Sequence, residues 1–330
     1  MAQGQRAAAS DYNSIRTTIF NLMGVGSTTT GYGQPISATA VSAGAVITVS
    51  QWTTIESDLK KARQHQTGVA VTNGTASGSL MTQLQTVTSS TVVSENIRLQ
   101  YQNFADGINA LAERTKAAAS QLTPGVAITS TTRSSGTNWG GAGLSASITH
   151  TVTITFNQYT SGSLTVTAAN AIRCFFNAGG SIQVTSSRTG AAANTKDTDW
   201  TNMLSGFGTF TLSANSSSIS GTLNAGGTVG SSIGYFQLTG TPQTVLNQSS
   251  SVTKYAENRY RINASVVANV ITLAITWLDN DAGDQTGVGG PVDEPVTGTI
   301  ASTVTYTRPS GSNVDIPAAA VSGSATAIST

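Results

Sequence analysis

The stretch that decides the fold is Ile148-Thr149-His150-Thr151-Val152-Thr153-Ile154-Thr155-Phe156. Successive side chains of a β-strand point to opposite faces, so this alternation predicts a strand with one apolar face and one threonine face. The same period of two recurs in residues 164–166, 182–184, 260–266, 271–277 and 300–306. Because Gly, Asn and Ser clusters separate these runs, they predict an antiparallel β-sandwich of about six to nine strands, interrupted by a short helix near 168–176.

The first third of the chain has a different period, three or four residues, which is typical of helices. Ser10 and Ser50 are the expected N-caps of the first two helices, and Gly24 and Gly68 are their expected ends. The apolar positions at this spacing are Tyr12, Ile15 and Ile19 in the first segment, Trp52, Ile55 and Leu59 in the second, and Ile97, Tyr101, Phe104, Ile108 and Leu111 in the third.

These two patterns predict an α+β protein that is mainly β. A helical N-terminal attachment module is expected over residues 1–125, followed by a β-sandwich body over residues 126–330. The apolar helix faces are expected to pack between copies of the chain or onto another protein. The glycine-rich segment 24–44 between the first two helices has no preceding strand and no Gly-Lys-Ser/Thr sequence, so we interpret it as a loop that needs positive φ angles and not as a phosphate-binding loop.

The composition indicates a surface that is covered by partners. Only 9 % of the residues are charged, against about 25 % in ordinary globular proteins. A soluble monomer normally covers itself with charged side chains, so their shortage favours a homo-oligomer, with a trimer or hexamer preferred. The net charge of +1 gives no reason to expect nucleic acid as a partner, and no apolar run approaches the length of a membrane span.

The beginning of the chain, Met1-Ala2-Gln3-Gly4-Gln5-Arg6, has no apolar export signal. We therefore expect a protein that is made in the cytoplasm and released by lysis, as virion proteins are. The single cysteine, Cys174, excludes a disulfide within the chain and a multi-thiolate metal site.

Catalysis needs titratable side chains, and few are available, so we expect no enzyme and no cofactor. His65 is interpreted as a cation near a helix C-terminus, and His150 is expected to be exposed or at an interface. Cys174 is more readily a small buried residue than a nucleophile, because no histidine is suggested beside it.

Acidic residues cluster between residues 279 and 294. Asp279, Asp281 and Asp284 are weak candidates for Ca²⁺ ligands, since Ca²⁺ takes several oxygen ligands in a flexible loop. The spacing does not fit an EF-hand, so a solvated acidic loop is the preferred interpretation. A paired-carboxylate glycosidase site is the third alternative.

Trp139 and Trp200 each lie in a segment that is interpreted as a loop. An exposed tryptophan can stack on a sugar, so both residues are possible contacts to a host surface glycan. Packing under a loop is the preferred role for each.

Several short motifs resemble a family of uncharacterised virion structural proteins in tailed bacteriophages, notably those that infect cyanobacteria and other aquatic bacteria. The motifs are Tyr12-Asn13-Ser14-Ile15, Gly31-Tyr32-Gly33-Gln34, His65-Gln66-Thr67-Gly68, Ala169-Asn170-Ala171-Ile172-Arg173 and Phe175-Phe176-Asn177-Ala178-Gly179-Gly180. The resemblance implies a structural role in the particle and carries no catalytic residue. The expected function is a tail, neck or fibre component that binds itself and other virion proteins. The alternatives are a capsid decoration protein and a carbohydrate-binding adhesin.

Overall fold

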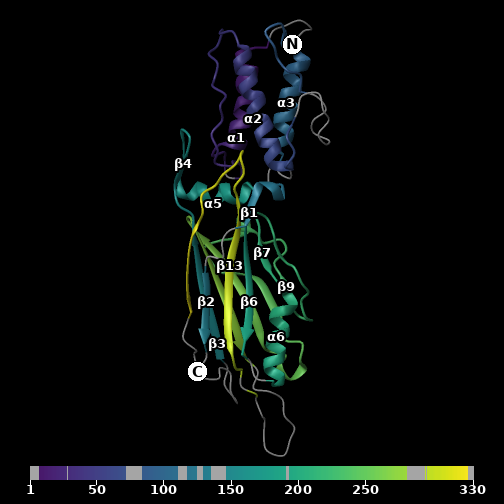
Figure 1. Ribbon diagram of the computed structural model, residues 1–330, viewed down its shortest axis with the longest axis vertical. Coiled ribbons are helices and arrows are strands. Elements are labelled where there is room, and N and C mark those ends of the chain that lie inside the picture. Colours follow the sequence, from purple (N-terminus) through teal and green to yellow (C-terminus); the bar gives the residue numbers. More distant parts are fainter. Residues whose placement is uncertain are drawn as a thin grey trace, which may run out of the picture. The chain divides into compact units, whose positions relative to one another are not determined.

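The computed structural model describes residues 7–27, 29–71, 84–110, 117–124, 129–134, 146–190, 193–280, 294 and 296–325 (Figure 1). The protein is α+β, and a helical N-terminal segment precedes the sheets, as predicted. It forms two compact units. Unit 1 comprises Met1–Thr123, Gln158–Gly180 and Arg308–Pro317, and unit 2 comprises Pro124–Asn157, Ser181–Thr307 and Ala318–Thr330. The first boundary lies near the predicted residue 125. The expectation that everything after it belongs to the sandwich is wrong, because two later segments return to unit 1.

Unit 1 is built on three helices, α1 (Ala9–Met23), α2 (Val49–Thr67) and α3 (Glu95–Asn109), which lie side by side (Figure 1). Their apolar residues recur at helical spacing and are buried against one another. At the centre, the Trp52 ring meets the rings of Tyr12 and Tyr101 edge to face, with centroids 5.6 and 5.2 Å apart. Such edge-to-face pairs are favourable beyond their area of burial.

The ends of α2 follow from its sequence. Thr48 and Gln51 form a capping box, in which the Gln51 N–H donates to the Thr48 hydroxyl (3.3 Å) and the Thr48 N–H donates to the Gln51 side chain (2.7 Å). The helix therefore starts before Ser50, the predicted cap. Gly68 ends it in the left-handed conformation with φ of 75°, as predicted from its position.

The remainder of unit 1 contains the short helix η1 (Ala119–Gln121), the hairpin of β4 (Tyr159–Ser161) and β5 (Leu164–Val166), and helix α5 (Ala168–Asn177). The glycine-rich segment is a loop with positive φ at Gly26, Gly31 and Gly33, as predicted. At Gly31 a Cβ atom would lie 2.3 Å from the Val25 carbonyl oxygen, so only glycine fits.

Unit 2 contains two antiparallel sheets. In one sheet β13 pairs with β6, and β7 and β8 follow, while β1 and β2 also pair with β13. The other sheet has the order β14-β3-β12-β11-β10-β9. The strands of the first sheet are β1 (Leu122–Pro124), of which Leu122 and Thr123 belong to unit 1, β2 (Thr129–Ser134), β6 (Ser181–Thr189), β7 (Phe210–Leu212), β8 (Ser217–Ile219) and β13 (Thr299–Pro309). The strands of the second are β3 (Ala146–Thr155), β9 (Thr228–Val229), β10 (Gln243–Ser249), β11 (Arg259–Val267), β12 (Val270–Asp279) and β14 (Ala320–Ala325).

The two sheets enclose the core of unit 2, which makes it the predicted sandwich. The deciding stretch forms β3, and the runs at 182–184, 260–266, 271–277 and 300–306 lie in β6, β11, β12 and β13. Among the described residues, hydrogen bonds between the sheets join His150 Nδ1 with the Ser302 hydroxyl and the Ser186 hydroxyl with the Tyr260 hydroxyl, each 2.8 Å long. The run at 164–166 forms β5 and belongs to unit 1, not to the sandwich.

His150 is fully buried, so the expectation of an exposed or interfacial histidine is wrong. Its position has the same parity as Ile148 and Val152, and it therefore points to the core face of β3. In the core its ring lies 4.7 Å from the Trp277 ring.

One helix of unit 2 was not predicted. Helix α6 (Thr195–Phe207) follows Asn194, whose side-chain oxygen accepts a hydrogen bond from the Asp197 N–H at 2.6 Å. Its buried residues Trp200, Met203, Leu204 and Phe207 follow helical spacing. Two short 3₁₀ turns, η2 (Tyr235–Gln237) and η3 (Thr253–Tyr255), complete unit 2.

Candidate functional site

The first turn of α6 is surrounded by an unusual group of charged side chains inside unit 2. We call it the α6 cluster: Arg188, Lys196, Asp197, Asp279 and Glu294. Its core is an ion pair between Lys196 Nζ and Asp279 Oδ2, which are 2.7 Å apart, and both side chains are 0 % exposed. Fully buried lysine and aspartate side chains are rare in proteins unless they are paired.

A second buried ion pair lies beside the first. The Arg188 guanidinium on β6 donates to the Asp197 carboxylate, and both side chains are 0 % exposed. The same carboxylate accepts hydrogen bonds from the Thr297 N–H (2.9 Å) and hydroxyl (2.6 Å). Asp197 therefore holds the backbone at Thr297 against the start of α6, where the positive end of the helix dipole favours an anion.

Glu294 is the fifth member of the α6 cluster and contacts the first turn of α6. Its Oε2 accepts hydrogen bonds from the Lys196 N–H (2.9 Å) and the Tyr255 hydroxyl (2.8 Å), and Lys254 Nζ lies 3.7 Å away. Burial raises the pKa of the Glu294 carboxyl, but these hydrogen bonds and the Lys254 charge outweigh it and lower the pKa below its usual value. Glu294 is thus an anion that fastens residue 294 to the helix N-terminus.

The position of Asp279 corrects the Ca²⁺ hypothesis for this residue. Asp279 is the last residue of β12 and points into unit 2, where it pairs with a lysine instead of facing a loop. Asp281 and Asp284, the other two candidates, lie outside the described residues. Within the described ranges, no group of three or more His, Cys, Asp or Glu side chains is placed to hold a metal ion.

The predicted attachment surface of the helices is also corrected. Tyr12, Ile15, Ile19, Ile55, Leu59, Tyr101 and Ile108 are 0 % exposed, and Trp52, Ile97 and Phe104 are 2, 5 and 3 % exposed. These side chains bury one another within a single chain, so they are not available to a second copy. Leu111 lies outside the described residues.

The Trp200 side chain is not accessible at the surface, so it is not available as a contact to a glycan. Trp200 lies on α6 and not on a loop, and its side chain is 0 % exposed. The preferred interpretation, core packing, is confirmed for Trp200. Trp139 lies outside the described residues.

The other titratable candidates are buried in unit 1. His65 Nε2 lies 2.9 Å from the Ala178 carbonyl oxygen, and burial lowers the pKa of His65 to about 4, so the prediction of a cation at the end of α2 is wrong. Burial raises the pKa of the Cys174 thiol to about 11, with the Arg173 charge opposing the shift. A thiol that stays protonated is a poor nucleophile, so the prediction of a small buried residue is confirmed.

Sequence reasoning missed the role of Arg173. This α5 side chain donates hydrogen bonds to the carbonyl oxygens of Val25, Ser27 and Thr30 in the glycine-rich loop. One guanidinium therefore provides donors for three carbonyl oxygens of this loop.

On the outer side of one sheet of unit 2, the strands β3, β12 and β14 form what we call the threonine face, and Arg261 of the next strand, β11, borders it opposite Thr276. The side chains of the threonine face are half-buried or exposed, and none of them is charged. They belong to β3, β12 and β14, and the pairing register places them in adjacent rows. The face comprises Thr149, Thr151, Thr153, Thr155, Thr272, Ala274, Thr276, Ser322 and Ser324.

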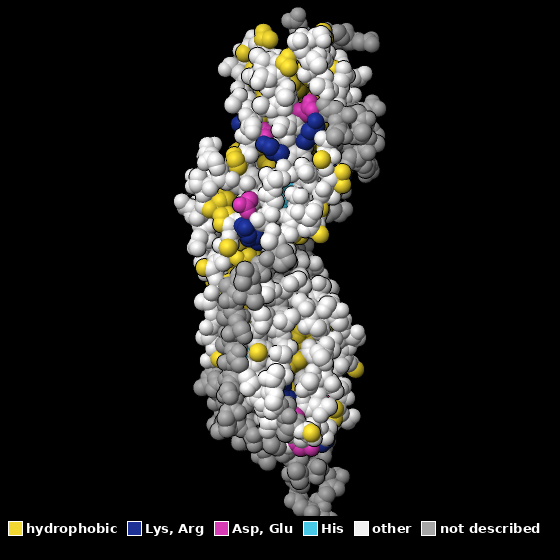
Figure 2. Space-filling model, viewed as in Figure 1, with side chains coloured by type: hydrophobic (Ala, Val, Ile, Leu, Met, Phe, Trp, Pro, Cys, Tyr) yellow, Lys and Arg dark blue, Asp and Glu magenta, His cyan; other side chains and the backbone are white. Residues whose placement is uncertain are grey.

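Described residues line two grooves on the surface of unit 1. A cavity of about 580 Å³ near the start of α2 is lined by uncharged residues, among them Val46 (80 % exposed), Val49 (38 %) and Val92 (68 %). We call it the tip groove. Figure 2 shows that, over the surface it presents, uncharged side chains far outnumber charged ones.

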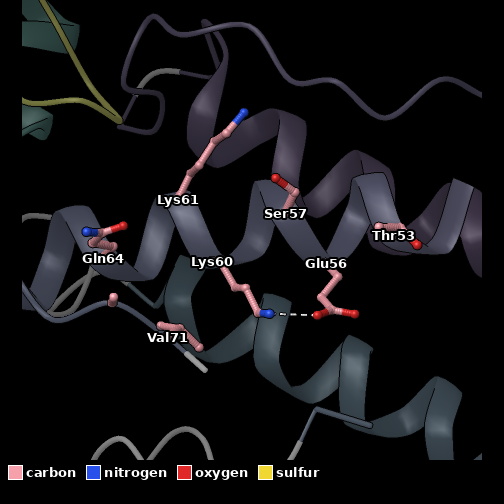
Figure 3. A pocket seen from close by; sticks show the side chains of 8 residues that line it. Thr53, Glu56, Ser57, Lys60, Lys61, Gln64 and Val71 are labelled. Carbon is pink, nitrogen blue, oxygen red and sulfur yellow. Dashed lines mark hydrogen bonds and ion pairs between the residues drawn. The ribbon is translucent and has the colours of Figure 1, made fainter. Parts of the chain in front are cut away.

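The second groove, of about 360 Å³, runs along α2 and contains charged side chains (Figure 3). Lys60 points to Glu56 and forms an ion pair of 2.7 Å, whereas Lys61 points away from it (Figure 3). Glu56 also accepts a hydrogen bond from the Tyr101 hydroxyl at 3.0 Å. Glu56 therefore connects α2 to α3 at the edge of this groove.

Within the part of the chain that the structure describes, no helix combines the length and the apolar character needed to cross a membrane. Comparisons with family models, with curated proteins and with solved structures found no match to this chain.

Proposed function

We propose that this protein is a non-enzymatic structural component of a tailed-phage virion, and that several copies assemble symmetrically in a tail, neck or fibre. The observation that carries the proposal is the threonine face, which has no charged side chain over three neighbouring strands and is bordered by Arg261 on β11. Natural sheets usually protect exposed surfaces and edges with charged side chains, which oppose association. Their absence from this face favours burial against another subunit.

Hydrogen bonds between hydroxyl groups of the threonine face lower the free-energy cost of removing water from it. The Thr149 and Thr276 hydroxyls lie 3.0 Å apart across β3 and β12, and the Thr153 and Ser322 hydroxyls lie 2.6 Å apart across β3 and β14. A polar group that already has a partner loses little when water is removed, whereas an unpaired one loses a full hydrogen bond. The threonine methyl groups add apolar area to the contact.

A homo-oligomer suits this face because identical copies bring no like charges together. Closed rotational symmetry is the usual arrangement of identical subunits, and the axial symmetry of phage appendages favours a trimer or hexamer. The resemblance to virion proteins supports the same assignment. We therefore place the protein in the virion, which is assembled in the host cytoplasm and released by lysis.

Attachment to other virion proteins is assigned to the tip groove. The apolar faces of α1, α2 and α3 are used up in the core of unit 1, so they leave the tip groove as an apolar surface with projecting valines. An uncharged apolar segment of another virion protein would cover Val46 and Val92, which are too exposed to contribute to the core.

Light scattering coupled to size-exclusion chromatography tests the assembly. We expect a discrete oligomer at micromolar concentration, and a double change of Thr151→Lys and Thr153→Lys should shift it to the monomer because buried ammonium groups are costly. The matched control is Thr222→Lys with Thr241→Lys, at two exposed threonines away from the threonine face. A monomeric wild-type protein would contradict the proposal, as would an oligomer that withstands both lysines on the face.

A further inference from the structure

We propose that Lys196 and Asp279 become joined by an amide bond between Lys196 Nζ and Asp279 Cγ, which the folded protein forms without an added reagent. This inference is independent of how the copies assemble. It rests on one geometric fact: an amine and a carboxyl group are held at 2.7 Å with both side chains 0 % exposed. The two residues come from different elements, the first turn of α6 and the last position of β12.

The surroundings disfavour a permanent ion pair. Moving two charges out of water costs several kcal/mol each, and a lysine in the first turn of a helix lies near the positive end of the helix dipole. The Tyr255 ring, whose centroid is 5.3 Å from Lys196 Nζ, covers the amine with an aromatic surface. An amide in the same place would carry no charge and would remove both penalties.

The reaction balances with the groups that are present. Transfer of one proton from the Lys196 ammonium to the Asp279 carboxylate gives a neutral amine and a neutral carboxylic acid. The nitrogen lone pair then attacks Cγ, the new C–N bond forms, and the C–OH bond breaks. The hydroxyl leaves with one proton of the amine as a water molecule, so no oxidant, reductant or cofactor is required.

Two features of the site promote this condensation. Fixed proximity of two reacting groups is equivalent to an effective concentration of about 10⁵ M or more in well-oriented systems. Exclusion of water from a buried site opposes the reverse reaction, hydrolysis of the amide. The second feature distinguishes this pair from lysine–carboxylate pairs at the surface.

Other ion pairs of the chain provide internal comparisons. Lys60 and Glu56 are also 2.7 Å apart, but the lysine side chain is 27 % exposed, so water competes for the site. The buried Arg188–Asp197 pair cannot react in this way because a guanidinium stays protonated in proteins. Among the ion pairs of the described residues, only Lys196 and Asp279 combine full burial with an amine.

The bond would connect α6 covalently to the end of β12. In a chain with a single cysteine, this link would take the place that a disulfide has in other extracellular proteins. A particle component that carries mechanical load would gain resistance to unfolding by force.

The mass of the intact, denatured full-length protein tests the proposal. We expect a mass below that of the sequence by one water molecule. A tryptic digest should contain a branched peptide that joins the segments around residues 196 and 279, because trypsin does not cleave after an acylated lysine. The full sequence mass together with cleavage after Lys196 would overturn the proposal, and this result does not depend on the folding of any variant.

Three variants locate the bond. Lys196→Arg should restore the full sequence mass, and Asp279→Asn should lose ammonia instead of water, because the carboxamide nitrogen then leaves with a proton of the Lys196 amine. The control Lys60→Arg changes the exposed pair and should still lose water. A loss of water that persists in Lys196→Arg or in Asp279→Asn would place the dehydration elsewhere and overturn the assignment.

Discussion

The environment of the buried His65 ring favours the neutral imidazole over the doubly protonated form. Nε2 faces the Ala178 carbonyl oxygen at 2.9 Å, and Nδ1 has no hydrogen-bond partner among the described residues. Burial lowers the pKa of His65 to about 4, although the bond to Ala178 opposes the shift. The neutral imidazole is therefore part of the folded structure of unit 1.

This histidine predicts a loss of stability in mild acid. Because the folded pKa of about 4 lies below the ordinary value of 6.5, the unfolded chain binds more protons between these values. The stability is fully present above pH 6.5 and decreases as the pH falls to 4, by about 3 kcal/mol at most. Hydrogen exchange of the α2 amides at pH 7 and pH 5 should show the decrease.

The variant His65→Gln is the control, since it keeps a polar side chain and removes the titration. Its α2 amides should be less protected at pH 7 and should depend less on pH than those of the wild type. An equal pH dependence in the two proteins would show that His65 is not the group responsible.

Ala268 has an unfavourable backbone conformation in the two-residue turn between β11 and β12, with φ of 55°. A left-handed conformation costs residues other than glycine about 1 kcal/mol. Ala268→Gly should therefore raise the midpoint of chemical denaturation of unit 2, by an amount equal to about 0.5–1 kcal/mol. Ala214→Gly, at a position without positive φ, should instead destabilise the protein. A lower stability for Ala268→Gly would contradict this account of the turn.

Burial could be predicted from the sequence where a residue is part of a regular alternation of apolar and polar neighbours. The alternation in β3 placed Ile148, Val152 and Ile154 on the core face, where they are at most 1 % exposed. The prediction failed for His150, which was expected outside the core although its parity places it inside. Its parity with Ile148 and Val152 was a sufficient signal, whereas its partner in the core, Ser302, is 152 residues away in the sequence and no local pattern shows it.

The stability of a helix depends on groups that satisfy the free N–H and C=O groups at its two ends. Helix α2 has such groups at both ends. The reciprocal bonds of Thr48 and Gln51 begin it, and Gly68 ends it. Ser50 is a plausible cap by residue type alone, but the reciprocal bonds with Gln51 favour Thr48, three residues before it. Prediction of the helix itself was sound, since its apolar spacing extends over several turns.

The cap supplies a prediction at this scale. Thr48→Ala removes the acceptor for the Gln51 N–H and should lower the free energy of unfolding of unit 1 by about 1 kcal/mol. Thr48→Ser keeps the hydroxyl and should cost clearly less. Hydrogen exchange of the first turn of α2 measures both effects. Equal protection in Thr48→Ala and in the wild type would show that the cap does not hold the helix end.

Helix α6 shows why an element can be missed. The spacing of Trp200, Met203, Leu204 and Phe207 was a helical signal, and Asn194 was a suitable N-cap. The segment around Trp200 was nevertheless interpreted as a loop, and its first turn contains the charged residues Lys196 and Asp197. Their true role is in the α6 cluster, which depends on residues 188, 279 and 294, and no local pattern connects these positions.

At the scale of the whole molecule, the chain supplies each unit from several separate segments. Residues 158–180 and 308–317 complete unit 1, although the segments on either side of them belong to unit 2. Periodicity shows that a segment has a buried face but not which core buries it. The fold class and most strands could therefore be predicted, whereas the division into units could not.

The same limit applies to the attachment surface. Patterns identified the apolar faces of the helices correctly, but a buried face and a docking face have the same spacing. Only the structure shows that α1, α2 and α3 cover one another. Among the described residues, we propose the threonine face and the tip groove as the surfaces that bind partners.

The most direct test of the central proposal is to count this protein in intact particles. Phage particles should be purified by density gradient from a lysate that contains the chain, and the chain should then be quantified by mass spectrometry against a known structural protein. We predict a fixed number of copies per particle that is a multiple of three, and gold-labelled antibodies should bind at the tail, neck or fibres. Antibody labelling over the capsid would instead identify the chain as a capsid decoration protein and would contradict a position in the tail, neck or fibres. A chain that remains in the soluble fraction, absent from the particles, would contradict the proposal.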